Sequence, residues 1–392
     1  MGFNSHLKMR NNDSTLSFPT LTARQRQSIT DDDSPPDRIS TLTRLSLPNE
    51  PFSIAATFWS STVLRDSGGF WHLGYRSHGN DPCRIDLEER LEVTDVKGFF
   101  GDLSGVIGAV THSGKLLVLD DLYESQSMRL ERCHRLCRSL TGTNDKDVVS
   151  VEHVAVAGND QVCVAIKASS KRVEHGEWVV HVFATSTAMF DGDASLREHR
   201  MPKAVSCVTA GATAFALLLE DGCILTFGSR LQPALLARSP TPDSPAEVPC
   251  PIEQLGGISI QKTVMDQWLG GALSIERDLY IWGGRAGETV RINALPEHEE
   301  DVMLADIDDG ADIVDVSLGM GHILALTAEG TVWACGDNKY GQIGLEPRDQ
   351  GFAPHWSQVD VPGSHDGTFV SISVGGWGSW ITAEAEPIVT EP

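Results

Sequence analysis

Short apolar runs separated by glycine-centred turns recur along most of this chain. Residues 205–209 and 214–219 are apolar runs rich in small and branched side chains, and Gly211 divides them. A tight-turn signal follows at 220–222, and another apolar run covers 223–227. Short runs of this kind, bounded by turn residues, predict β-strands joined by hairpins.

The glycines that bound these runs keep a fixed spacing. In the clearest unit they are Gly319, Gly330 and Gly336, which gives steps of 11 and 6 residues. The same two steps recur in the unit that opens at Gly211. Weaker copies bring the total to seven units, 46 to 56 residues apart. The unit openings are Thr57, Leu103, Gly158, Gly211, Asp266, Gly319 and Gly375.

Several short strands in each unit predict one small sheet per repeat. Such a sheet cannot bury both faces alone, and radial stacking into a β-propeller solves this problem. The chain ends match the repeat, because Pro392 falls at the phase of the third glycine and residues 2–4 resemble the segment after it. We therefore predict an all-β, seven-bladed β-propeller whose ring is closed by both termini. Residues 1–392 are expected to form a single domain.

The unit over residues 319–345 is the most complete, and it ends in Trp333-Ala334-Cys335-Gly336-Asp337-Asn338-Lys339-Tyr340-Gly341-Gln342-Ile343-Gly344-Leu345. It resembles the repeat of the regulator of chromosome condensation family, which runs roughly as Gly-x-x-His-x-x-Ala-Leu and then Gly-x-Val-Trp-x-x-Gly-x-Asn-x-x-Gly-Gln-Leu-Gly. The resemblance covers about residues 50–392 and implies that His322 makes structural hydrogen bonds within its blade. The positions expected to be structural are Gly211, Gly222, Gly228, Gly319, His322, Gly330, Trp333 and Gly336.

Polar inserts interrupt the repeat. Residues 8–50 are rich in Ser, Thr, Asp and Asn, and we expect a disordered excursion there. The segments 237–251 and 297–315 are predicted to be loops between blades. The first contains Ser-Pro and Thr-Pro steps. We favour a plain exposed insertion here, and kinase sites are the alternative. The second is strongly acidic and is either a solvated loop or a steering surface for a basic partner.

A basic stripe stands out in a third insert. Arg129, Arg132 and Arg135 are three residues apart, so a helix would carry them on one face. This face is either a docking surface for an acidic partner or a solvated helix face. Cysteines and a histidine at 133–137 lack the second ligand pair of a zinc site, so no metal is predicted.

Three of the nine tryptophans share one repeat phase. Trp59, Trp268 and Trp377 each lie two residues after a unit opening, and equivalent positions of a propeller lie on one face near its axis. They are candidate partner-binding residues, because tryptophan is enriched in interface hot spots. The alternative is that each ring packs under the adjoining blade.

Composition narrows the function. The formal charge is -23, which disfavours direct binding to nucleic acid or to anionic membranes. We find no apolar run long enough to span a bilayer, no signal peptide and no catalytic motif, and we expect no cofactor. Eight scattered cysteines favour a reducing compartment, so we expect the protein in the cytoplasm or nucleus. We also expect it to be a monomer.

The function expected from these features is that of a protein-interaction scaffold. Within the family, the acidic single propeller and the opening Gly2-Phe3-Asn4 look most like the fungal alpha-tubulin suppressor type. That resemblance implies a small zinc-protein partner that serves diphthamide synthesis and tRNA wobble-uridine modification. The alternative is a guanine-nucleotide exchange factor for a Ran-like small GTPase.

Overall fold

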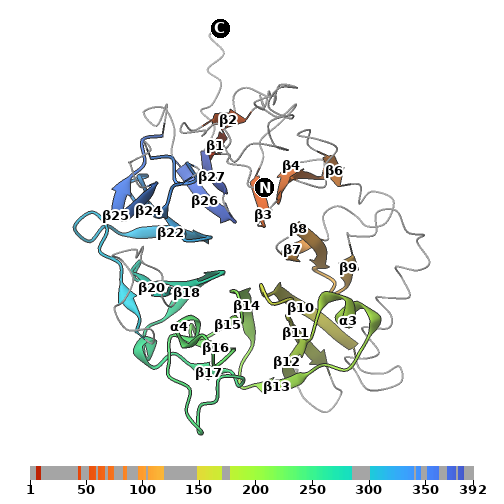
Figure 1. Ribbon diagram of the computed structural model, residues 1–392. Helices are drawn as coiled ribbons and strands as arrows, with labels where there is room; N and C mark the ends of the chain where they lie inside the picture. The colour runs from red at the N-terminus through yellow and green to blue at the C-terminus, as the bar shows by residue number, and fades with distance from the viewer. Residues whose placement is uncertain are drawn as a thin grey trace, which may run out of the picture. The chain divides into compact units, whose positions relative to one another are not determined.

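The structure is a computed structural model of the 392-residue chain. It describes residues 6–9, 43–45, 53–58, 61–66, 69–74, 83–85, 96–102, 105–118, 148–169, 177–284, 301–339, 341–345, 351–361, 369–376 and 378–383. The chain divides into two compact units, one made of Met1–Asp86 with Ile307–Pro392 and the other of Leu87–Asp306. The described residues of both units form only small sheets and short helices (Figure 1).

The described residues of the unit Leu87–Asp306 form four sheets. The first has three strands, β7 (Val96–Asp102), β8 (Gly105–Thr111) and β9 (Leu116–Val118). The second has β10 (Val148–Val156), β11 (Val162–Ser169), β12 (Glu177–Phe183) and β13 (Arg197–Met201). The third has β14 (Val205–Ala210), β15 (Ala214–Leu219), β16 (Ile224–Gly228) and β17 (Cys250–Pro251). The fourth has β18 (Ile260–Asp266), β19 (Leu269–Ser274), β20 (Leu279–Gly283) and β21 (Met303–Leu304).

Among the described residues of this unit, three short helices lie between the strands. They are α3 (Ser186–Asp191), α4 (Pro233–Leu236) and the 3-10 helix η2 (Glu253–Leu255). The hydroxyl of Thr185 caps α3 by accepting the Ala188 backbone N–H at 3.0 Å.

In the other unit, the part of the chain that the structure describes forms three sheets. One has β3 (Ser53–Thr57), β4 (Ser61–Asp66), β5 (Gly69–Gly74) and β6 (Cys83–Ile85). The next has β22 (Ile313–Gly319), β23 (His322–Thr327), β24 (Val332–Asp337) and β25 (Phe352–Gln358). The last has β26 (Phe369–Gly375), β27 (Gly378–Ala383), β1 (His6–Met9) and β2 (Thr43–Leu45).

The last of these sheets combines strands from both ends of the chain, as predicted (Figure 1). In it β1 runs parallel to β27, with Leu7 opposite Trp380, whereas the first three strands of every other sheet pair antiparallel. A parallel pair needs no hairpin turn here, because β1 and β27 come from opposite ends of the sequence. Seven sheets, one of them composite, confirm the predicted propeller class.

The second strand of most sheets is buried along its whole length. All six residues of Ala214–Leu219 are buried, and so are those of Leu269–Ser274 and His322–Thr327. Both faces of these strands are covered because the sheets stack: one core cluster joins Ala155 and Val180 to Val208 and Phe215 of the next sheet. This stacking explains why the sequence shows continuous apolar runs at these strands instead of an alternating pattern.

A β-bulge near the start of the first strand recurs in all seven sheets. The hairpin register shifts between Val96 and Gly98 in β7 and between Val151 and His153 in β10, so Lys97 and Glu152 are the extra residues. The corresponding shifts skip residues 55, 206, 261, 314 and 370. A bulge increases the local twist of a strand and redirects its side chains.

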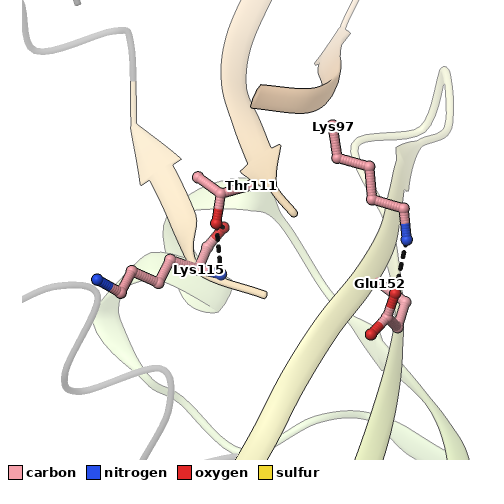
Figure 2. A network of polar contacts seen from close by, with 4 residues as sticks. All are labelled: Lys97, Thr111, Lys115 and Glu152. Carbon is pink, nitrogen blue, oxygen red and sulfur yellow. Dashed lines mark hydrogen bonds and ion pairs between the residues drawn. The ribbon is translucent and has the colours of Figure 1, made fainter. Parts of the chain in front are cut away.

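The bulge residues of two neighbouring sheets meet in an ion pair. Lys97 Nζ donates to Glu152 Oε2 at 2.6 Å (Figure 2), and the two side chains are 30% and 21% exposed. Close by, Thr111 Oγ1 accepts the Lys115 backbone N–H at 2.9 Å and orders the β8–β9 turn. The same turn joins the next sheet, because the Val151 N–H donates to Gly114 O at 3.0 Å.

We expect the Lys97–Glu152 pair to contribute little to stability. Replacing Lys97 by methionine should lower the free energy of unfolding by less than about 1 kcal/mol, because water and salt screen partly exposed pairs. The measurement is urea unfolding at low and high ionic strength, with Lys115→Met as the control for loss of a positive charge. A salt-independent loss for Lys97→Met would contradict this expectation.

Two predicted loops need correction. The segment 237–251 joins β16 to β17 and therefore lies within one sheet, not between two, and it is ordered around the buried Arg238. The segment 297–315 contains the edge strand β21 and the start of β22, so only residues 305–312 link one sheet to the next. Turns and these edge strands are hard to distinguish in sequence, because a strand of two residues is too short to show an alternating pattern.

The expected disordered excursion over 8–50 is interrupted by structure. Residues 8 and 9 belong to β1, and residues 43–45 form β2. The rest of that segment lies outside the described residues, as do the arginine insert with Arg129, Arg132 and Arg135 and residues 297–300.

Candidate interaction surface

The turns between the first and second strands contact one another through their backbones. In one unit the Gly158 N–H donates to Gly211 O at 3.0 Å, and the Ala212 N–H donates to Gln267 O at 2.6 Å. In the other unit the Met320 N–H donates to Gly376 O at 2.8 Å. The positions where the sequence repeats open are therefore neighbours within each of the two compact units. We call these the inner turns.

In three repeats the third glycine attaches a second loop to the inner turn. The N–H that follows this glycine donates to the inner-turn carbonyl: Ser229 to Thr213 at 3.0 Å, Gly284 to Trp268 at 2.7 Å and Asp337 to Gly321 at 2.8 Å. The residues that supply these carbonyl groups lie two positions after a repeat opening, which is also the position of Trp59, Trp268 and Trp377. In these three repeats the inner turn and its attached loop are thus joined by a backbone hydrogen bond.

Trp268 packs against the adjoining sheet. It is half-buried, and its neighbours are Ala212 and Ala214 of the previous sheet together with Leu235 and Leu236 of α4. The part of its ring that these residues cover supports the packing alternative, while the rest stays accessible. Trp59 and Trp377 lie outside the described residues, so the proposed three-tryptophan set stays a prediction.

Replacing Trp268 by alanine is expected to destabilise the fold by about 2 kcal/mol, because a half-buried aromatic ring leaves α4 uncovered. Thermal and urea unfolding measure this loss, and Trp71→Ala, a half-buried tryptophan of β5, is the comparison. An unchanged free energy of unfolding would show that the ring contributes no packing.

His322 is a structural residue. It is fully buried, and its Nε2 lies 3.1 Å from Ser379 Oγ in β27 of the neighbouring sheet. The predicted hydrogen bond therefore crosses to the next sheet and does not stay within its own blade. Burial lowers the pKa of His322 to about 4, so the ring is neutral at neutral pH. Gly319 makes room for this ring, because a Cβ there would lie 2.4 Å from His322 Cε1.

The tryptophans on the strands occupy the core to different degrees. Trp282 is fully buried and donates its Nε1–H to Leu235 O at 3.2 Å, and Gly270 makes room for its indole. Trp333 is only half-buried, and its Nε1–H donates to Thr331 Oγ1 at 3.1 Å.

Asp266 is a functional candidate that sequence reasoning missed. It occupies a unit opening, where four other repeats have glycine. The residue as a whole is half-buried, but its Oδ2 has essentially no exposed surface and no hydrogen-bond partner among the described residues. Burial raises the pKa of Asp266 to about 7, although a hydrogen bond from the Gln267 backbone acts in the opposite direction.

Thr57, which opens another repeat in the other compact unit, shows what is unusual about Asp266. There Thr57 Oγ1 lies 2.7 Å from Ser373 Oγ and donates to Val374 O at 3.0 Å. The repeat counterpart of Ser373 is Thr209, whose buried Oγ1 also has no partner in the described part of the chain. A polar residue at a glycine phase was the sequence signal that could have identified this site.

The described residues contain no cluster of His, Cys, Asp or Glu that could hold a metal ion. Cys163 and Cys335 are buried free thiols, and burial raises the pKa of both above the usual range. Among the described helices, none is long and apolar enough to cross a membrane.

Comparison with known proteins agrees with this architecture. The family model described as "Regulator of chromosome condensation (RCC1) repeat" matches residues 313–342, and a second model of the same description matches residues 329–381. The E3 ubiquitin-protein ligase HERC2 of Homo sapiens is 36% identical over 108 residues, which cover 26% of this chain. The chain spans about 2% of the length of that relative and of its Mus musculus counterpart.

Among solved structures, Prp20p from Saccharomyces cerevisiae superposes with a TM-score of 0.54 and 12% identity, covering 83% of this chain and 80% of that one. Human WBSCR16 gives a TM-score of 0.46 and 13% identity over 89% of this chain and 80% of that one. The stacked small sheets and the Prp20p match define a β-propeller. Residues 313–381 match the regulator of chromosome condensation repeat, and the fold is similar to that of Prp20p.

Proposed function

We propose that this protein is an interaction scaffold that binds protein partners through the face that the inner turns and their attached loops form in the unit Leu87–Asp306. The observation that carries this proposal is the network of backbone hydrogen bonds between inner turns, because it holds the attached loops in defined positions. The formal charge of -23 favours partners with basic surfaces.

Leu231 is the first residue to test on this face. It is 83% exposed, and its N–H donates to Ser229 Oγ at 3.2 Å, so the turn that carries it is held in place. Replacing Leu231 by serine should weaken partner capture from the native cell without changing the melting temperature. The matched control is Leu196→Ser, at a residue 53% exposed beside the outer strand β13. Equal capture by both variants would exclude this face.

The finer proposal concerns the partner. The resemblance to the alpha-tubulin suppressor type supports a small zinc protein, with a role in diphthamide synthesis and tRNA wobble-uridine modification. Affinity purification of the full chain from its native cell, followed by mass spectrometry, tests this. Recovery of such a zinc protein in stoichiometric amount is the expected result, and its absence from the captured set contradicts the proposal.

A second candidate is guanine-nucleotide exchange on a Ran-like small GTPase. It is favoured by the match to Prp20p, whose structure is reported together with its binding properties to Gsp1p and histones. The test is release of a fluorescent guanine nucleotide from the GTPase on addition of this protein. Accelerated release would replace the scaffold proposal by exchange activity. For either function we propose a monomer in the cytoplasm or nucleus.

A further inference from the structure

Arg238 is a buried cation whose hydrogen-bond acceptors among the described residues are all neutral. It is 7% exposed, and its Nη2 donates to the carbonyl oxygens of Thr226, Pro245 and Val248 at 3.1, 3.0 and 3.1 Å. Its Nη1 donates to Ser244 O at 2.9 Å and to Ser244 Oγ at 3.0 Å. None of the ion pairs among the described residues includes Arg238, and its buried Nε has no partner there. Burial lowers the pKa of Arg238, and the negative charge of Glu247 acts in the opposite direction without a hydrogen bond or ion pair to the guanidinium. A buried guanidinium that no carboxylate contacts is costly, so this group can bind an anion.

The loop around Arg238 contains a source for that anion. Residues 239–245 read Ser-Pro-Thr-Pro-Asp-Ser-Pro, which gives three hydroxyl residues that each precede a proline. Of these hydroxyls, that of Ser244 is the one bonded to the guanidinium. The loop tip at 241–243 is exposed, while Ser244 is half-buried.

We propose that Ser244 is a phosphorylation site for a proline-directed protein kinase and that Arg238 binds the resulting phosphate. In this step Ser244 Oγ forms a bond to the γ-phosphorus of ATP, and the bond from that phosphorus to the β–γ bridging oxygen breaks. ADP leaves, and the hydroxyl proton passes to the catalytic base of the kinase. The product carries a charge of about -1.5 to -2 at pH 7 beside the guanidinium.

Access of the kinase to Ser244 requires only local opening of the loop tip. Two backbone hydrogen bonds close the tip, from the Thr241 N–H to Ser244 O at 3.1 Å and from the Ser244 N–H to Thr241 O at 3.2 Å. The Ser244 N–H also lies 3.0 Å from Thr241 Oγ1. Surface segments held by a few exposed hydrogen bonds open far below the cost of global unfolding. Once the tip recloses, charge-assisted hydrogen bonds to Arg238 hold the phosphate.

The loop transmits this change to the interaction surface through α4. Ala246 of the loop packs in one cluster with Leu235 and Leu236 of α4, and Trp268 packs against the same cluster. Thr226 links the two parts: its Oγ1 donates to Leu236 O at 2.6 Å, and its own backbone carbonyl accepts a hydrogen bond from Arg238. Phosphorylation of Ser244 is therefore expected to stiffen the support beneath Trp268.

The experiment uses the folded full-length chain, a proline-directed kinase and ATP, with phosphate sites mapped by mass spectrometry. We expect phosphate on Ser244 and a rise in melting temperature of about 2 to 5 °C, because a phosphate–arginine pair stabilises the loop. In Arg238→Lys, which keeps the charge but loses the planar fork, the rise should shrink by at least about half. Ser244→Ala, which keeps Ser239 and Thr241, should show no rise after the same treatment.

Three results would overturn the proposal. The first is a folded protein without phosphate on Ser244 although a synthetic peptide of residues 234–250 is modified there. The second is a phosphorylated wild type with an unchanged or lower melting temperature. The third is an equal rise in Arg238→Lys, since the phosphate would then act without the guanidinium fork. None of these readouts depends on a partner, so they are independent of the proposed scaffold function.

Discussion

Replacing Asp266 by asparagine is expected to stabilise the folded protein at pH 8 by about 3 kcal/mol, and by no more than about 4. The cause is burial of a carboxyl group whose Oδ2 has no hydrogen-bond partner among the described residues. Burial raises the pKa of Asp266 from 3.8 to about 7, so ionisation is easier in the unfolded chain than in the folded one. Asparagine occupies the same volume without a charge to bury.

The pH dependence of this effect has a definite sign. Below the unfolded pKa of 3.8 both states keep the proton, and Asp266 adds no pH-dependent term. Between that value and about 7 the unfolded state loses its proton first, so the stability of the wild type falls as pH rises. The advantage of Asp266→Asn should therefore be small near pH 4 and complete near pH 8.

Urea unfolding of both proteins from pH 4 to pH 8 measures the difference. The control is Asp221→Asn, because the hydrogen bond from Lys203 lowers the pKa of this exposed carboxyl. Its substitution should remove stability above the unfolded pKa, which is the opposite sign. Parallel pH profiles for wild type and Asp266→Asn would show that the carboxyl is not held in its neutral form.

Replacing Gly336 by alanine is expected to destabilise the fold by about 3 kcal/mol or more, which ranks among the larger single-residue effects. Gly336 has a φ of 104°, and a Cβ there would lie 2.2 Å from Gly321 O. That carbonyl accepts the Asp337 N–H, so the clash would also separate the attached loop from its inner turn.

Gly330→Ala is the matched control, in the same repeat and also at a positive φ of 78°. No atom lies within 4 Å of the Cβ that it would add, so only backbone strain remains, about 1 kcal/mol. Urea unfolding of both variants gives the comparison. Equal losses would mean that close approach of the backbone does not explain the third repeat glycine.

The interaction surface was predictable only in part. Counting residues shows that Trp268 occupies the same position in its repeat as Thr213 and Gly321 do in theirs. The structure agrees, because the carbonyl groups of all three residues accept equivalent hydrogen bonds. Asp266 was overlooked because a degenerate repeat position carries no apolar or glycine signal. The environment of Arg238 was equally hidden, since the carbonyl groups around it are backbone atoms from residues 226 to 248 and leave no pattern of side chains.

By itself the sequence determined the number of repeats, the turns, the buried second strands and the propeller class. These features depend on local properties, namely glycine where φ is positive and apolar side chains where sheets stack, and such properties recur at fixed spacing. The tertiary structure decided the bulge in every first strand, the parallel pairing of β1 with β27 and the contact between His322 and Ser379. It also decided which charges became buried, as at Asp266 and Arg238. Each of these depends on contacts between residues far apart in the chain, which no local pattern encodes.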